Sequence, residues 1–230
     1  MITFYYNAAP NPMKIALFLE EAGLAYDPVP IDTRRGQQHA PAFRAINPNG
    51  KVPVITDGEA TVFDSNAILL YLAEKTGRFL PPEGPGRRGE LLSWLMFVAS
   101  GVGPFSGQAV HFRNFAPEKV PYALKRYDFE ARRHWQILED RLSAAPYMLG
   151  DTYTIVDMSV WGWASRLSYM LGDDRIMESY PNIDRLMCEI DARPAAERAQ
   201  ALAKSHAFKV AFDDEAMRAL YPQIFAPDPA

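Results

Sequence analysis

The sequence predicts an α/β domain followed by an all-α domain, and three observations support this division. Apolar spacing switches repeatedly between strand and helix periods in residues 1–80, in the order βαβ and then ββα. Over residues 80–89 the composition changes to proline, glycine and charge, which is typical of a linker. Beyond it, strand signals nearly vanish and helical spacing takes over. We therefore expect domains at residues 1–80 and 90–230, joined by a linker at 81–89.

The opening of the α/β domain predicts a strand, a helix and a second strand. Ile2–Tyr6 is a β-prone run, and the turn-forming Pro10-Asn11-Pro12 follows it. Residues 13–22 have the apolar spacing of a helix with one buried side, and Gly23 ends it. Residues 26–31 contain two prolines, so this strand is expected at a sheet edge, where missing backbone donors do least harm.

The rest of this domain predicts a hairpin followed by a helix. Ser65 is expected to cap the helix and Gly77 to end it. The expected elements, in order, are a polar loop with a short helix at 32–48, a strand at 52–56, a turn at Asp57-Gly58, a strand at 61–63 and a helix at 66–75.

Helical periodicity organises the second domain. Apolar residues recur every three or four positions over residues 124–142, which predicts one long amphipathic helix. Thr154-Ile155-Val156-Asp157 has the pattern of an N-terminal capping box, so an apolar helix is expected at 158–171. Residues 205–230 are expected to form a helical or irregular tail.

Charge and composition argue against several classes of function. Lys and Arg number 24 against 28 Asp and Glu, and the basic pairs are scattered, so no nucleic-acid partner is expected. Residues 91–112 carry no formal charge, but serines, glycines and Pro104 interrupt them; we expect a buried helix with a break near Pro104 and no membrane span. No metal site is expected, because the four histidines lie far apart: His39, His111, His134 and His206.

Cys188 is the single cysteine, so the chain cannot form an internal disulfide or a CxxC redox pair. Such a chain suits the reducing cytoplasm, and its start, MITFYYNAAP, lacks the pattern of a secretory signal. Because Leu186, Met187 and Ile190 surround Cys188 on a predicted helix, we expect it to be a small buried hydrophobe. With no evident nucleophile, an active enzyme would take its reactive group from a cosubstrate.

Three motifs in order, NPNGKVPVITD, FDSNAILLYLAEKTG and TIVD, resemble the cytosolic glutathione transferase superfamily along nearly the whole chain. The stretches FYYNAAPNPMKIALFLEEAGLAY and GVGPFSGQAVHFRNFAPEKVPYALKRYDFEARR are most similar to the bacterial nu class and its Ure2-like relatives. The resemblance implies a thioredoxin-like N-terminal domain that binds glutathione and an all-helical C-terminal domain that lines a second, apolar pocket. It also implies a homodimer, with glutathione as cosubstrate for reduction of disulfides or conjugation to electrophiles.

The resemblance places glutathione beside Val52, Pro53, Asp64 and Ser65. A residue that precedes a cis proline presents its backbone N–H and C=O sideways, so Val52 can pair with a peptide as an added strand would. The ordinary alternative is a strand-entry proline. Ser65 and the first amides of its helix form an anion site for the γ-glutamyl carboxylate, and Asp64 can accept from the ammonium group. Taken alone, Ser65 is more often only a cap.

The other end of the tripeptide carries a glycyl carboxylate, which needs a cation or amide donors. Lys51 and Gln38 match the family positions that supply them, and His39 is their expected neighbour. In a loop, Lys and Gln are usually only solvated. Arg126 matches a position that reaches glutathione from the partner subunit in nu-like relatives; an exposed helix face is the equal alternative.

The glutathione thiol needs a donor at the end of the first strand. Nu-like relatives place a threonine and an asparagine here, whereas this chain has Ala9 and Asn11. Asn11, through its side-chain amide or its backbone N–H, is therefore the leading catalytic residue, and Tyr6 or Tyr5 is the alternative. Strand alternation sends only one of the two tyrosines into the core.

The resemblance therefore predicts an enzyme whose attacking sulfur is the glutathione thiolate. Candidates for the wall of the second pocket are the aromatic residues of the helical domain, although they are at least as suited to the core: Phe97, Phe105, Phe112, Trp161 and Trp163. Ala9 favours the alternative, a non-catalytic glutathione-binding regulatory protein of the same fold.

Overall fold

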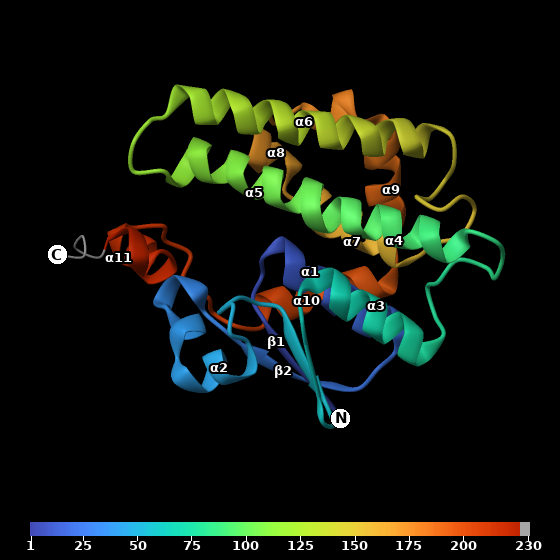
Figure 1. The fold of residues 1–230 in the computed structure, drawn as a ribbon, viewed down its shortest axis with the longest axis horizontal. Helices are drawn as coiled ribbons and strands as arrows, with labels where there is room; N and C mark the ends of the chain where they lie inside the picture. Colours follow the sequence, from blue (N-terminus) through green and yellow to red (C-terminus); the bar gives the residue numbers. More distant parts are fainter. Residues whose placement is uncertain (226–230) are drawn as a thin grey trace.

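The computed structural model describes residues 1–225, and the end of the predicted tail, 226–230, lies outside the described residues. Figure 1 shows a sheet with its helices in one part of the molecule and a bundle of helices in the other. The first part contains β1 (Ile2–Tyr6), α1 (Pro10–Ala22), β2 (Tyr26–Pro30), α2 (Pro41–Ile46), β3 (Val54–Asp57), β4 (Ala60–Phe63) and α3 (Ser65–Thr76). The chain then forms α4 (Arg87–Phe97), α5 (Gly103–Val110), α6 (Pro121–Ser143), α7 (Ile155–Ala164), α8 (Leu167–Leu171) and α9 (Pro181–Asp191), and returns to the first part with α10 (Pro194–Lys204) and α11 (Asp214–Leu220).

The four strands form one mixed sheet in the order β2-β1-β3-β4. β1 pairs with β2 in parallel, and β3 pairs antiparallel with both β1 and β4. β2 therefore lies at an edge, as its prolines predict. Side chains along β1 alternate between the two faces, so that Phe4 and Tyr6 enter the main core. Tyr5 points to the other face and packs against Phe43, with ring centroids 5.9 Å apart.

Two helices of the α/β domain begin earlier than expected. α1 begins at Pro10, because a proline at the first helical position lacks only an N–H that would be unpaired there. α3 begins at Ser65, and its cap is Asp64, whose Oδ1 accepts from the backbone N–H of Asn66 at 2.9 Å and of Ala67 at 3.2 Å. The prediction that Ser65 caps this helix is therefore wrong by one residue.

The helical domain follows the predicted order with shifted boundaries. α4 begins at Arg87, so the last three residues of the predicted linker are helical, and Arg87 pairs with Glu90 within the first turn. The break predicted near Pro104 is a π-helical turn at Val98–Val102 between α4 and α5. α6 is the long amphipathic helix. The helix predicted at 158–171 is divided into α7 and α8.

The predicted capping box at the start of α7 is confirmed. Asp157 Oδ2 accepts from the backbone N–H and the hydroxyl of Thr154, at 2.8 Å and 3.0 Å. Its other oxygen accepts from the backbone N–H of Met148 at 2.8 Å. Burial raises the pKa of Asp157 to about 6, against the effect of these hydrogen bonds, which favour the carboxylate. The box thus fixes both the start of α7 and the loop that precedes it.

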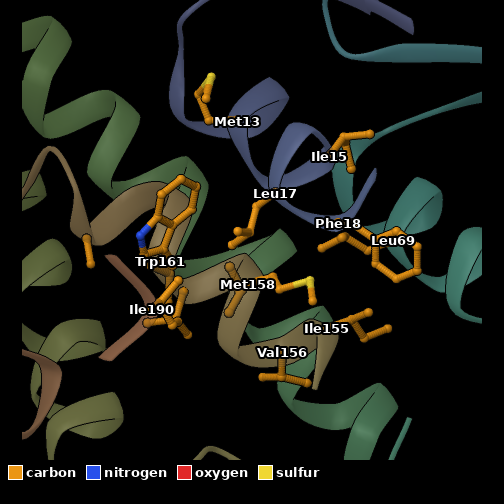
Figure 2. Packing of buried hydrophobic residues seen from close by; sticks show 14 of the residues in the cluster. Met13, Ile15, Leu17, Phe18, Leu69, Ile155, Val156, Met158, Trp161 and Ile190 are labelled. Carbon is orange, nitrogen blue, oxygen red and sulfur yellow. The ribbon is translucent and has the colours of Figure 1, made fainter. Parts of the chain in front are cut away.

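One continuous core joins the two domains. Figure 2 shows side chains of α1, such as Leu17 and Phe18, directed into the same core as Ile155 and Met158 of α7. A buried polar contact adds to this junction, because the hydroxyl of Ser159 in α7 donates to Asn66 in α3 at 2.6 Å. The sheet domain is therefore held against the bundle through α1 and α3.

Cys188 is exposed, which contradicts the expectation of a small buried residue. α9 buries Ile183, Leu186, Met187 and Ile190, which occupy positions i, i+3, i+4 and i+7. Cys188 lies outside this apolar stripe. Its apolar neighbours in sequence predicted burial, but they form a helix face that does not include Cys188.

Within residues 1–225, no helix combines the length and the apolar character that crossing a membrane requires. In the same part of the chain, no three His, Cys, Asp or Glu side chains are grouped as metal ligands.

Candidate functional site

A cavity of about 600 Å³ lies where the two domains meet. This volume is typical of a small-molecule site. The α/β domain contributes Asn11 from the first turn of α1, Lys51 from the loop before β3, and Asp64 and Ser65 from the start of α3. These are four of the residues predicted to hold glutathione, and the fold brings them together around one cavity although the sequence separates them.

Asp64 forms the acidic end of the cavity. Its φ is 72°, a left-handed conformation that non-glycine residues adopt at a cost of about 1–3 kcal/mol. This conformation turns the chain from β4 into α3 and lets Oδ1 cap the helix. Two amides that were expected to bind a ligand carboxylate, those of Asn66 and Ala67, are consequently occupied by the protein's own carboxylate.

Three polar side chains form a chain of hydrogen bonds beside Asp64. Lys14 Nζ donates to Ser65 Oγ at 3.4 Å, and the Ser65 hydroxyl donates to Asn11 Oδ1 at 3.3 Å. Because its carbonyl oxygen accepts from Ser65, the Asn11 side chain is oriented with its NH₂ group free to donate to a ligand. Asn11 also follows Pro10 and precedes Pro12, neither of which has a backbone N–H. Its own N–H is thus the first donor at the positive end of α1.

Neither tyrosine of β1 lines the cavity. Tyr6, predicted as an alternative catalytic donor, is fully buried, and its hydroxyl contacts His206 Nδ1 and donates to the Leu202 carbonyl at 3.3 Å. Burial also raises the pKa of Tyr6. The expectation that Tyr6 meets the thiol is wrong, since strand alternation directs it into the core. Tyr5 is directed to the opposite face of the sheet, against Phe43.

Gln38 and His39 lie away from the cavity lining. Gln38 is 3% exposed, and its Nε2 donates to the carbonyl of Ala219 at 3.1 Å. The ring of His39 contacts the same carbonyl through Nε2 at 2.9 Å. A carbonyl oxygen of the C-terminal tail thus occupies the two side chains that were expected to bind the glycyl carboxylate. Of the residues predicted for that end, Lys51 alone lines the cavity.

The tail, defined as residues 205–225, crosses from the helical domain to the α/β domain (Figure 1). Asp32 Oδ2 accepts from the backbone N–H of Lys209 at 2.7 Å. Arg34 donates to the backbone carbonyls of Lys209, at 3.2 Å, and Val210. Beyond these contacts, Tyr221 and Ile224 reach the cavity and form part of its wall. The tail therefore closes one side of the site.

We expect Arg34→Ala to loosen the tail. Hydrogen bonds from a charged donor contribute about 1.5–3 kcal/mol, so amide hydrogen exchange in α11 should accelerate by roughly 10–100-fold. Hydrogen exchange followed by mass spectrometry measures this change. Arg87→Ala is the matched control, because Arg87 is an exposed arginine that pairs with Glu90 in the first turn of α4. Unchanged exchange in α11 after Arg34→Ala would show that these contacts do not hold it.

The helical wall of the cavity combines small, polar and apolar residues, and the apolar ones are Val98, Ala99 and Pro104. Gly103, Gly107 and Gln108 of α5 line it, together with His111 and Trp163. The glycines let α5 approach Trp163, since a Cβ at Gly103 would lie 3.2 Å from Trp163 Nε1. Burial lowers the pKa of His111.

Trp163 is the one predicted aromatic residue that this cavity wall includes within the described chain. Phe97 and Phe105 each stack on His134, with ring centroids 5.1 Å and 4.9 Å from that of the histidine. Phe112 stacks on Tyr127, and the ring N–H of Trp161 donates to Asp191 at 2.9 Å. The aromatic rings that were expected to line an apolar pocket therefore pack against other residues of the helical domain.

Three predicted residues, Val52, Pro53 and Arg126, do not line the cavity. The Val52–Pro53 peptide bond is cis, as expected, and it leads into β3. Arg126 lies on α6 and pairs with Glu130 at 2.5 Å. Hydrogen bonds from Arg133 and then Arg126 hold the pKa of Glu130 below its usual range, against the effect of its burial. Within one protomer, Arg126 is therefore engaged by its own helix.

Sequence reasoning missed Lys14 and the tail residue Tyr221. Lys14 follows Asn11 by three positions, one helical turn, so it shares the helix face of the predicted thiol donor. Lys14 is also the one charged residue among the eight consecutive buried residues of α1, 12–19. Both signals are readable in the sequence. Tyr221 carries no such signal, because its place depends on the path of the tail.

Comparison with known proteins agrees with this geometry. Residues 1–74 match the family Glutathione S-transferase, N-terminal domain, and residues 122–187 match Glutathione S-transferase, C-terminal domain. The disulfide-bond oxidoreductase YfcG of Escherichia coli is 41% identical over 206 residues, which cover 86% of this chain and 94% of that protein.

Two solved structures share the fold over most of their length. A glutathione transferase family member from Pseudomonas fluorescens with two glutathione bound has a TM-score of 0.80 and 32% identity, covering 86% of this chain and 91% of that one. A glutathione transferase from Pseudomonas putida with one glutathione disulfide bound per subunit has a TM-score of 0.79 and 30% identity, covering 86% and 90%. With its four-stranded sheet domain, its helical domain and these matches along both, the chain belongs to the glutathione S-transferase family.

Proposed function

We propose that this protein is a cytoplasmic, homodimeric glutathione transferase of the nu type, which uses the thiolate of bound glutathione to reduce disulfides. One observation carries the proposal: Asn11, Lys51, Asp64 and Ser65, predicted to bind different parts of glutathione, surround one cavity. The single cysteine supports a reducing compartment. Glutathione is the cosubstrate, and no metal is required.

The cavity can promote ionisation of the bound thiol. An unperturbed thiol has a pKa of about 8.5 and is only a few per cent ionised at neutral pH. Lowering this pKa by about two units requires roughly 2.7 kcal/mol of preferential stabilisation of the thiolate. The NH₂ group of Asn11 and the amide at the positive end of α1 are suited to supply it, because hydrogen bonds to anions are the strong ones.

Reduction then requires two glutathione molecules. The first thiolate attacks one sulfur of the substrate disulfide, forms a mixed disulfide and releases the other sulfur as a thiolate, which takes a proton. A second glutathione thiolate attacks the glutathione sulfur of the mixed disulfide. This step forms glutathione disulfide and releases the second substrate thiol after protonation, so the protein itself is not oxidised.

Disulfide reduction is favoured over conjugation by the chemistry of the helical wall. Gln108 and His111 offer polar groups to the peptide of a second glutathione, and Gly103 and Gly107 leave room for it beside the apolar Val98, Ala99 and Pro104. The Pseudomonas fluorescens and Pseudomonas putida relatives, with two glutathione or one glutathione disulfide, support the same reading.

In a dimer, Arg126 could contact bound glutathione, which it does not reach within its own protomer. The Arg126 side chain is half exposed and lies on α6, outside its own cavity. We propose that it reaches the glutathione of the partner subunit, as its family position implies. Val52, preceding Pro53, is proposed to pair with the peptide backbone of glutathione. Gln38 and His39 would join the glycyl end where the tail carbonyl releases them.

Ala9 favours a second candidate, a glutathione-binding regulatory protein without turnover. Ala9 caps α1 by position but has no hydroxyl to offer the thiol. Glutathione affinity without turnover on either type of substrate would support this candidate.

The deciding experiment offers glutathione with a small disulfide or with an aryl halide to the same purified sample. We expect turnover of the disulfide and a slower rate with the aryl halide. Cys188→Ser is the control for protein thiol chemistry and should retain full activity, since Cys188 lies on the surface of α9. If neither substrate is turned over, the proposal that this protein is an enzyme is wrong. Loss of activity in the folded Cys188→Ser variant would refute a mechanism that uses glutathione thiols without a protein thiol.

A further inference from the structure

Lys14 is a buried cation in the cavity wall that thiolate attack does not use. Its side chain lines the cavity, yet the residue is only 1% exposed. Nζ lies 3.4 Å from Ser65 Oγ, and Lys14 forms no salt bridge within residues 1–225. Burying an ammonium group without a paired anion is costly. A ligand that carries an anion to this point would remove that cost.

The fold holds the lysine stem in place. α7 passes over it at Gly162, where a Cβ would lie 2.5 Å from Lys14 Cγ and 2.7 Å from the Pro10 carbonyl oxygen. A larger residue would therefore displace either α1 or the stem. With α7 packed this closely, the ammonium group remains at the Ser65 end of the cavity.

The start of α3 needs such a cation if it is to bind a carboxylate. Asp64 already occupies the amides of Asn66 and Ala67, and its charge offsets the positive end of the helix. A carboxylate beside Ser65 would meet repulsion from Asp64 unless a cation lies closer. Lys14 is placed to be that cation.

We infer that Lys14 binds the α-carboxylate of the γ-glutamyl residue of glutathione, while Asp64 accepts from the adjacent ammonium group. The two side chains then present opposite charges to the two charges of one amino acid moiety. This inference rests on the proposed function and assigns to it a residue that recognises the substrate. A peptide lacking that carboxylate would leave Lys14 buried and unpaired.

The titration of Lys14 makes the contact measurable. Burial lowers the pKa of its ammonium group to about 7, and the nearby Asp64 carboxylate partly offsets this effect. The other charged or titratable groups that line the cavity are Lys51, His111 and Tyr221. A bound carboxylate favours the ammonium form and raises its pKa. Binding should therefore take up about one proton at pH 8, where free Lys14 is mostly neutral, and roughly a tenth as much at pH 6.

Isothermal calorimetry in buffers of different ionisation enthalpy measures this proton uptake. The probe is S-methylglutathione, which keeps both ends of the peptide and has no thiol to ionise. We expect uptake at pH 8 with the natural protein and none with Lys14→Met, whose affinity should fall by roughly 10–100-fold. Lys14→Gln, which retains a donor for Ser65 without a charge, should also show no uptake.

Two controls separate this contact from a structural role. Lys204→Met, which removes an exposed lysine, should leave uptake unchanged. An S-methylglutathione analogue with the γ-glutamyl α-carboxylate converted to an amide should bind without uptake and should not distinguish Lys14→Met from the natural protein. Undiminished uptake in folded Lys14→Met or Lys14→Gln would overturn the inference alone. Absence of binding by both S-methylglutathione and glutathione would overturn the proposed function and this inference with it.

Discussion

Replacing Asn11 with alanine should reduce kcat/KM for glutathione-dependent disulfide reduction by roughly 10²–10³-fold, the effect of removing one preorganised donor to a developing or bound anion. The loss is expected to be large because Asn11 is the proposed donor to the thiol, and the other candidates near the end of β1 offer no side-chain donor to the cavity. Ala9 has no hydroxyl, Tyr5 faces away, and Tyr6 is buried against the tail. Among these residues near the end of β1, Asn11 alone lines the cavity, and it is the side chain proposed to meet the sulfur.

The same substitution should raise the pKa of the bound glutathione thiol toward its value in water. The ultraviolet absorbance of the thiolate, followed against pH in a glutathione-saturated sample, measures this pKa. Since Ser65 orients the Asn11 amide by donating to its Oδ1, the NH₂ group is a fixed donor rather than a rotating one. Its removal should shift the thiol pKa upward by about one to two units.

Tyr6→Phe is the comparison that separates the two predicted donors. It removes the hydroxyl that contacts His206 and Leu202, and should leave the pKa of the bound thiol unchanged. Asn114→Ala, at an exposed asparagine after α5, controls for a general effect of the substitution. If Tyr6→Phe raised the thiol pKa and Asn11→Ala did not, the assignment of Asn11 would be reversed. A loss of less than tenfold with Asn11→Ala would assign the thiolate to its backbone N–H.

Apolar periodicity, capping residues and turn residues predict the order of the helices and strands, because the start and end of each element depend on residues close in sequence. The edge position of β2 follows from its prolines, and the start of α7 follows from Thr154 and Asp157. The error at α3 has a local cause as well: two adjacent residues, Asp64 and Ser65, can each cap a helix. A left-handed conformation at Asp64 decides between them, and the sequence does not show that conformation.

The positions of the predicted residues that lie away from the cavity depend on contacts between distant segments. Gln38 and His39 bind Ala219, a residue about 180 positions away, and no local pattern records that contact. Phe97 and Phe105 have the composition of a pocket wall, but each stacks on His134 within the helical domain. Site residues in local motifs at the start of a helix, such as Asn11 and Ser65, are therefore easier to place from the sequence. Side chains whose partners are distant in sequence are harder to place.

Asp157→Ala should be the most destabilising single substitution of those considered, with a loss of about 3–5 kcal/mol in the free energy of unfolding. The carboxylate accepts three hydrogen bonds in a fully buried position, from Met148 N–H and from the N–H and hydroxyl of Thr154. Alanine would leave these donors buried without partners, and the cost of unpaired buried donors exceeds the gain from the bonds themselves. Urea denaturation measures the change.

Asp151→Ala is the matched control, because Asp151 is an exposed aspartate six residues earlier in the same loop region. Its effect should stay within about 0.5 kcal/mol. Asp157→Asn, which keeps one acceptor oxygen, should fall between the two. A loss below about 1 kcal/mol for Asp157→Ala would mean that other groups satisfy these donors after the substitution.

The loss at Asp157 should appear in both domains at once. α7 carries Ile155 and Met158 into the core that α1 shares, and Ser159 binds Asn66 of α3, so loosening the start of α7 weakens the support of the sheet as well. All four tryptophans lie in this core or pack against it from the helical side: Trp94, Trp135, Trp161 and Trp163. Their fluorescence should therefore change at the same urea concentration as the far-ultraviolet circular dichroism, for the variant as for the natural chain. Two separate transitions would show that the sheet domain keeps its structure without α7, and that the core between the domains does not fold as one unit.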